Sequence, residues 1–213
     1  MIRSVIVLLF VSLLSLTGCA LKVVPQPVAS GQINEKDNSQ TVTKNGIAIT
    51  VRNDQREMMS YNLDETVTSF LVTVTNGTGK ELSIPSDGFL LIDNANHQHN
   101  PLTPDKLKEM VSKDSYYLMP YPYVGFYYME DYERAYSNAV IGSQQPYYYE
   151  VYPQDIYTNA FPNGTIIPKS TVSGQVYFMA DLANMTGMKL LIYLKGTTKS
   201  AQPDFTFPFA IKK

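Results

Sequence analysis

Three acidic residues stand close together in a stretch that is rich in tyrosine. Glu130, Asp131 and Glu133 fall within four positions of one another. Paired carboxylates beside aromatic rings are the groups that a glycoside-hydrolysing site requires. Acidic residues that are adjacent in sequence more often form a solvated surface, because the two catalytic groups must be held at a set separation. Both interpretations stay open at this stage.

The two histidines of the chain suggest metal binding as a second kind of chemistry. His97 and His99 would face the same side of a strand, because side chains alternate across a strand. Imidazole nitrogens on one face could ligate zinc. The polar neighbours Asn96, Gln98 and Asn100 instead favour a solvated hairpin. We therefore expect no metal at these histidines.

Three methionines near the end of the sequence offer thioether sulfurs. Met179, Met185 and Met188 could capture a soft metal ion. Unbranched methionine also fills irregular gaps in protein cores, and this packing role is the favoured interpretation.

Other catalytic and nucleic-acid-binding signatures are missing from the sequence. Neither a G-x-S-x-G motif nor an S-x-x-K motif is present at a strand-to-helix turn, and no glycine-rich phosphate loop occurs. Nineteen acidic side chains balance seventeen basic ones, and no basic stretch could neutralise a row of phosphates. We expect a protein that is not an enzyme and does not bind nucleic acid.

Tyrosine is the most unevenly distributed residue of the chain. Of sixteen tyrosines, only Tyr61, Tyr177 and Tyr193 lie outside residues 116–157. A tyrosine ring offers a large apolar face with a polar tip and is enriched where proteins meet partners. Packing of the rings over one end of the folded body is the alternative. The residues expected to bind a partner are Tyr123, Tyr127, Tyr128 and Tyr132.

The first eighteen residues have the layout of a secretory signal peptide. Arg3 provides a cationic start, and residues 5–14 form an apolar stretch that only Ser12 interrupts. A helix that spans a membrane needs about 20 predominantly apolar residues, and this run is shorter. We therefore expect residues 1–18 to be removed after export.

Leu16-Thr17-Gly18-Cys19 closely resembles the lipobox of bacterial lipoproteins. The resemblance implies acylation of the Cys19 thiol, cleavage between Gly18 and Cys19, and attachment to a membrane of the cell envelope. Ala20 after the cysteine would direct such a protein to the outer membrane in a Gram-negative cell. Cys19 is the only cysteine, so no internal disulfide can form. The covalent lipid at Cys19 is the only prosthetic group that we expect.

The elements that would position these residues begin after the signal peptide. Residues 19–44 are expected to form the lipidated cysteine and a flexible tether, because Pro25, Pro27 and a polar run over residues 34–40 interrupt them. The rest of the chain, residues 45–213, is expected to form one β-sandwich domain with a tyrosine-rich insertion at about 103–168.

Alternating apolar residues predict most of the strands. The expected strands cover residues 47–52, 66–75, 89–93, 172–179, 188–195 and 205–211. Thr103-Pro104 begins a short helix to residue 111, and one helical turn is expected near 155–161. Pro208 cannot donate to a sheet, so the last strand should lie at an edge or carry a bulge.

This pattern predicts an antiparallel β-sandwich of about seven or eight strands with one or two short helices. The runs FLVTVTN (70–76), FLLID (89–93) and VSGQVYF (172–178) resemble those of the immunoglobulin-like, or telokin-like, sandwich domains of secreted bacterial lipoproteins. Such domains are mostly binding or scaffolding modules. The resemblance therefore implies a lipid-anchored, non-catalytic binding or assembly module whose partner is an envelope protein or a glycan. The alternatives are a glycan hydrolase using Glu130 or Glu133, and a metal-binding envelope protein.

Replacing the lipid acceptor tests the processing prediction directly. A Cys19→Ser variant should lose its acyl chains and its membrane attachment, because serine has no thiol to acylate. Membrane fractionation with mass spectrometry of the mature chain measures both properties, and Ala20→Ser serves as the neighbouring control. A Cys19→Ser chain that stays on the membrane with the wild-type mature mass, apart from the substitution itself, would contradict the lipoprotein interpretation.

Overall fold

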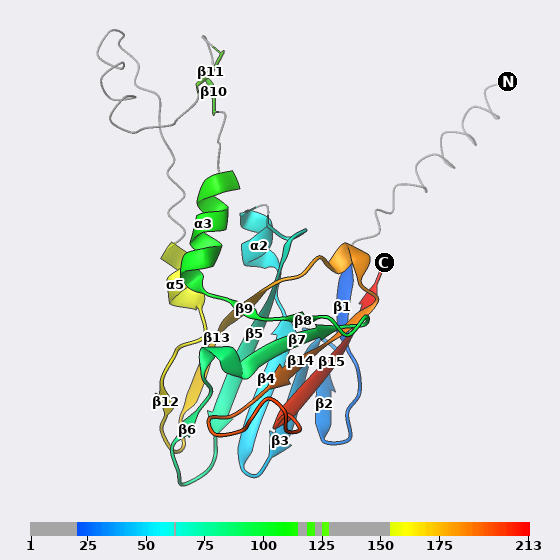
Figure 1. Ribbon diagram of the computed structural model, residues 1–213, viewed down its shortest axis with the longest axis vertical. Coiled ribbons are helices and arrows are strands. Elements are labelled where there is room, and N and C mark those ends of the chain that lie inside the picture. The colour runs from blue at the N-terminus through cyan, green and yellow to red at the C-terminus, as the bar shows by residue number, and fades with distance from the viewer. Residues whose placement is uncertain (1–20, 62, 115–118, 122–124, 128–153) are drawn as a thin grey trace, which may run out of the picture.

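The structure, a computed structural model, describes residues 21–61, 63–114, 119–121, 125–127 and 154–213. Over these residues the protein is mainly β. Antiparallel strands form two open sheets that lie face to face, and three short helices gather at one end (Figure 1). The predicted mainly β antiparallel sandwich is confirmed.

The two sheets of the sandwich contain five and six strands. The five-stranded sheet has the order β1 (Lys22–Pro25), β15 (Phe205–Lys212), β14 (Gly187–Ile192), β7 (Phe89–Asp93) and β8 (Gln98–His99). The six-stranded sheet has the order β2 (Gly31–Asn34), β3 (Ser39–Lys44), β4 (Ile47–Asn53), β5 (Val67–Asn76), β13 (Thr171–Met179) and β9 (Pro101–Leu102).

Short elements complete the described part of the chain. Two small pairs of strands are β6 (Leu82–Ser83) with β12 (Thr165–Ile166) and β10 (Met119–Tyr121) with β11 (Gly125–Tyr127). The α-helices are α2 (Arg56–Ser60), α3 (Pro104–Asp114) and α5 (Gln154–Asn159). The 3₁₀ helices are η1 (Ser86–Gly88) and η3 (Leu182–Asn184).

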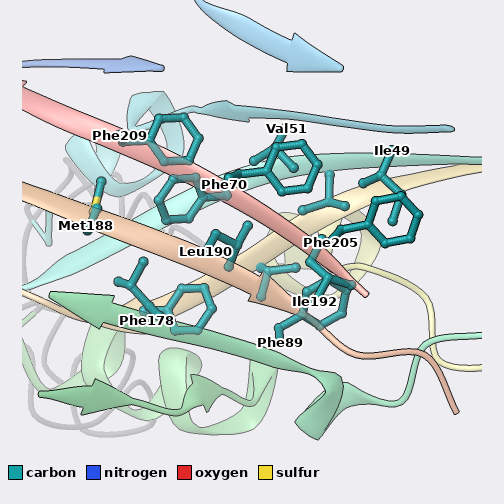
Figure 2. Close-up of a cluster of buried hydrophobic side chains, with 14 of the residues drawn as sticks. Ile49, Val51, Phe70, Phe89, Phe178, Met188, Leu190, Ile192, Phe205 and Phe209 are labelled. Carbon is teal, nitrogen blue, oxygen red and sulfur yellow. The ribbon is translucent and has the colours of Figure 1, made fainter. Parts of the chain in front are cut away.

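Alternate side chains of both sheets point inward and form the main core. In β15 the inward residues are all buried, while their neighbours are partly exposed or exposed. Phe70 of β5 contacts Phe178 in its own sheet and Phe209 across the interface, with ring centroids 6.1 Å and 5.2 Å apart. Figure 2 shows these rings interleaved with aliphatic side chains from both sheets. Because one face of each strand is buried in this core, apolar residues recur at every second position of the sequence.

The predicted elements from residue 47 onward are found close to their expected positions. The strands predicted at 47–52, 66–75, 89–93 and 172–179 correspond to β4, β5, β7 and β13, and the last two predicted strands correspond to β14 and β15. The predicted helix at 104–111 is α3, which extends to Asp114. Thr103 caps it as expected, since its Oγ1 accepts from the backbone N–H of Lys106 at 3.2 Å.

The prediction of a flexible tether over residues 19–44 is wrong for the described residues 21–44. These residues form β1, β2 and β3, with Val23 and Val42 buried in the main core. The polar run is the turn of a hairpin, in which Asp37 accepts hydrogen bonds from the N–H and the hydroxyl of Ser39. Asn, Asp and Ser are frequent in turns as well as in flexible chain, so composition alone misled us.

The prediction that the last strand lies at an edge or carries a bulge is also wrong, because the register of β15 is continuous on both sides. β15 pairs with β1 on one side and β14 on the other. Pro208 is tolerated because β1 ends at Pro25, opposite Phe209, and the carbonyl of the next residue, Gln26, accepts instead from Gln40 Nε2 at 2.7 Å. The carbonyl of Pro208 still accepts from Gln26 N–H at 2.8 Å. β1, which lies in the predicted tether, is thus the second neighbour of β15. Together with β2 and β3 it raises the number of strands above the predicted seven or eight.

Gly174 allows the chain after α5 to lie directly against β13. A Cβ atom at this position would lie 2.7 Å from the carbonyl oxygen of Ala160 and even closer to the backbone of Phe161. Phe161 N–H donates to the carbonyl of Gln175 at 2.8 Å, and its ring packs against Phe89. This close approach fixes where the chain that follows α5 joins the sandwich.

A methyl group at position 174 should force these segments apart. Gly174→Ala is expected to lower the free energy of unfolding by about 1–3 kcal/mol, the usual cost of overpacking. Gly79→Ala is the matched control, since a Cβ there meets nothing within 4 Å. Urea unfolding of both variants measures the difference. Equal stability of the two variants would show that the contact at Gly174 is not tight.

Candidate functional site

Three helices cover one end of the outer face of the six-stranded sheet. Their apolar side chains form a second buried cluster, separate from the main core. Leu107 and Val111 of α3 pack in this cluster with Ile156 of α5, against Tyr177 of β13. The other buried members are Met58, Tyr61, Leu63 and Val67. We call α2, α3 and α5 together the helical cap, and it lies above the sandwich in Figure 1.

The helical cap holds both ends of the tyrosine-rich part of the sequence. α3 ends at Asp114, and α5 begins at Gln154. Sixteen tyrosines less the four at positions 61, 157, 177 and 193 leave twelve in residues 115–153. Because α3 and α5 share one buried cluster, the chain leaves and re-enters the same small structural unit.

Polar contacts fix the start of α2 against β5. Gln55 Oε1 accepts from the backbone N–H of Ser69 at 2.8 Å, and the hydroxyl of Ser69 donates to the carbonyl of Asp54. The Asp54 carboxylate is nearly buried between Arg52 and Arg56, at 3.0 Å and 2.8 Å. The hydrogen bond from Arg56 holds the pKa of Asp54 below its usual value. The short helix α2 is therefore held by tertiary contacts at its first residues.

Glu57 of α2 is a partly buried carboxyl group in the helical cap. The hydroxyl of Tyr177 donates to Glu57 Oε2 at 3.0 Å, and Tyr177 itself is buried. Burial raises the pKa of Glu57 above its ordinary value, and the hydrogen bonds from Tyr177 and Asn159 oppose only part of that effect. Burial and the neighbouring Glu57 carboxyl also raise the pKa of the Tyr177 hydroxyl. This pair joins α2 to β13, and burial favours the protonated form of the Glu57 carboxyl.

Asp93 organises the hairpin between β7 and β8. Its Oδ1 accepts from the backbone N–H groups of Ala95 and His97, both at 2.8 Å. Its Oδ2 lies 2.9 Å from His97 Nδ1 and 3.5 Å from His99 Nε2. Burial alone would raise the pKa of Asp93, but these hydrogen bonds lower it to about 2. His99 Nδ1 donates to the carbonyl of Met179 at 2.9 Å and so links the two sheets.

The histidines predicted to share a strand face therefore converge on one carboxylate. No group of three or more His, Cys, Asp or Glu side chains that could hold a metal ion occurs within the described ranges. Met185 and Met188 are buried in the main core, which confirms the packing interpretation for both, whereas Met179 is exposed. The predicted solvated hairpin is found, with His97 largely exposed.

Most of the other predicted site residues lie outside the described residues. These are Gly18, Cys19, Tyr123, Tyr128, Tyr132, Glu130, Asp131 and Glu133. Tyr127 is the last residue of β11, and its backbone pairs with Met119 of β10. Within the ranges that the structure describes, no helix has the length and apolar character needed to cross a bilayer.

The remaining outer face of the six-stranded sheet carries paired hydroxyl groups. Their oxygens lie 2.8 to 3.0 Å apart across neighbouring strands. The pairs are Thr41 with Thr50, Thr73 with Ser173, and Thr75 with Thr171. Sequence analysis placed Thr41 in the predicted tether and gave none of these residues a functional role. Because this face is polar, the exposed side chains of Met59 and Tyr157 in the helical cap are the better candidates for contact with a partner.

Sequence analysis also missed Glu57 and Asp93. Asp93 had a usable signal, since an acidic residue directly before a tight turn often accepts the turn's N–H groups. Glu57 had none, because its partner Tyr177 lies 120 positions away in the sequence.

The raised pKa of Glu57 predicts a pH-dependent stability that a neutral side chain would lack. The folded state favours the protonated acid, so the contribution is fully present below the unfolded pKa, near 4.5, and is lost as pH rises through the folded pKa. Glu57→Gln should therefore gain stability relative to the wild type as pH rises from 5 to 8. Urea unfolding at several pH values measures this change, and the exposed substitution Glu81→Gln is the control. A pH-independent difference would contradict the burial of the carboxyl.

Comparison with known proteins gives no family for this chain. A scan against protein-family models finds no match, and searches of curated proteins and of solved structures find none either. The proposals below therefore rest on the residues and their geometry.

Proposed function

We propose that this protein is a non-catalytic binding or assembly module of the bacterial cell envelope, held on a membrane by lipid at Cys19. The lipobox-like run Leu16-Thr17-Gly18-Cys19 supports the lipid anchor. In a Gram-negative cell, Ala20 favours the outer membrane. The partner is another envelope protein or a glycan.

One observation carries the binding role. The segment that holds twelve of the sixteen tyrosines begins and ends on the helical cap, which has its own buried core. A fixed pair of attachment points reduces the conformational entropy that a binding segment loses when it meets a partner. Tyrosine rings can stack on sugars or pack against a protein while their hydroxyls form hydrogen bonds. This combination favours recognition over catalysis.

Substitution within the segment tests the proposal in the native envelope. A chain with Tyr123, Tyr127, Tyr128 and Tyr132 replaced by Ser should lose at least tenfold in the yield of one specific crosslinked product, because truncating a single interface hot spot, a class enriched in tyrosine, costs about 2 kcal/mol or more. The same four residues replaced by Phe should retain most of it, since the rings remain. Crosslinking of the full-length chain, followed by identification of the captured component, measures both.

Substitution of two acidic residues distinguishes the hydrolase alternative from the binding proposal. Glu130→Gln with Glu133→Gln should abolish a glycan-cleaving activity and leave a tyrosine-based contact nearly unchanged. If the Gln pair loses the crosslinked product and the Ser set keeps it, the binding proposal is overturned in favour of an enzyme. An unchanged crosslinked product with the Ser set would also overturn it.

A further inference from the structure

One end of the sandwich gathers several elements that are far apart in the sequence. Lys22 at the start of β1 lies opposite Lys212 at the end of β15. Met179 at the end of β13 leads through η3 into β14, whose first residues pair with the end of β15. The helical cap covers the same end of the other sheet, so these elements share the upper part of Figure 1. We call this the cap end of the molecule.

The residue that would carry the lipid is covalently close to this end. Lys22 is only three residues after Cys19. Three residues span at most about 11 Å even when fully extended. A lipid on Cys19 would therefore hold the first residue of β1 within about one Debye length of the membrane surface. No long tether separates the sandwich from the bilayer, in contrast to the expectation from composition.

Exposed apolar side chains concentrate at the cap end. Six large apolar side chains are exposed among the described residues, and Ile33 and Ile167 are the two that lie elsewhere. The other four are Leu21, Met59, Tyr157 and Met179, with exposed fractions between 43% and 60%. Leu21 directly precedes β1, Met59 and Tyr157 belong to the helical cap, and Met179 ends β13. Methionine and tyrosine side chains of this kind suit the boundary between lipid headgroups and acyl chains.

The charges at the start of β1 are positive and lack carboxylate partners. Lys22 and Lys212 are exposed and directly opposite each other, an arrangement that costs stability in an isolated sheet. Neither forms an ion pair within the part of the chain that the structure describes. An anionic surface would supply the missing counter-charge.

We propose that the cap end rests directly on a bilayer containing anionic phospholipid. Lys22, Lys212 and Lys213 contact the headgroups, while Leu21 and the exposed methionines reach the apolar boundary. This inference rests on the acylation of Cys19 in the proposed function, but it adds an orientation and a lipid chemistry. The hydroxyl pairs Thr73 with Ser173 and Thr75 with Thr171 then lie toward the end of the six-stranded sheet that is farther from the membrane.

Two single-cysteine reporters test the orientation in the acylated full-length protein. Acylation blocks Cys19, so an added cysteine is the only thiol available for a fluorophore. Ala183→Cys places the label on exposed η3 at the cap end, and Gly79→Cys places it at the opposite end. The ten-residue strand β5 separates the ends by about 30 Å. Headgroup-attached quenchers in phosphatidylglycerol-containing vesicles should quench the label at position 183 at least threefold more than the label at 79.

A matched pair of charge variants tests the lipid chemistry. Lys22→Gln with Lys212→Gln should lower the docked-to-undocked ratio about 30-fold at low salt, at about fivefold per lysine near an anionic surface. Lys80→Gln with Lys195→Gln removes the same charge from the opposite end and should leave the ratio unchanged. The wild-type protein on phosphatidylcholine vesicles should show the same lowered docked-to-undocked ratio as the variant with Lys22→Gln and Lys212→Gln.

The outcomes separate this inference from the proposed function. Equal quenching at positions 183 and 79, with the protein still bound to vesicles, overturns the orientation and leaves the lipid anchor intact. Stronger quenching at 183 that is the same in phosphatidylcholine overturns the anionic headgroup contact. A full-length chain that carries no lipid and does not bind vesicles overturns both proposals. Selective quenching that depends on Lys22 and Lys212 supports them.

Discussion

Burial of alternate side chains between the two sheets is the interaction on which the rest of this structure depends. Phe70 illustrates it, because its ring is fully buried and packs against Phe178 beside it and Phe209 across the interface. Burying one such side chain stabilises a fold by roughly 1.5–3 kcal/mol. Only when this interface has formed do the ends of β4, β5 and β13 offer a surface to the helical cap. The cap's own cluster is too small to form without that support.

The carboxyl groups at the cap end respond to pH in opposite directions. Asp93 is held ionised by hydrogen bonds, so its contribution is present above the unfolded value of 3.8 and is lost as pH falls toward about 2. Glu57 is partly desolvated, so its contribution has the opposite sign and declines as pH rises above 4.5. The protein therefore combines a hairpin carboxylate, Asp93, that stabilises the fold when ionised with a carboxyl group, Glu57, that stabilises it when protonated. Moderate acidity satisfies both groups.

The sequence predicted what repeats at short range and failed where distant residues decide the outcome. Periods of two in residues 66–75 and 205–211 are visible because one face of each strand is buried. The four-residue strands β1 and β2 have too few buried positions to show a pattern, and the pairing partner of β1 lies at the other end of the chain. The same reason explains Pro208, whose tolerance depends on where β1 ends. Of the candidate groups, the histidines were noticed, but their shared carboxylate Asp93 was not.

The pairing of β1 with β15 also constrains how the protein can fold. Lys22 and Lys212 are 190 positions apart (212 − 22) and yet adjacent in the ladder. The first strand therefore has no hydrogen-bonding partner in its sheet until the last strand has been synthesised. Contacts of such high sequence separation slow folding, because a long loop must close first. In the proposed lipid-anchored protein, the sheet that contains β1 would therefore close only after the N-terminus has reached the membrane.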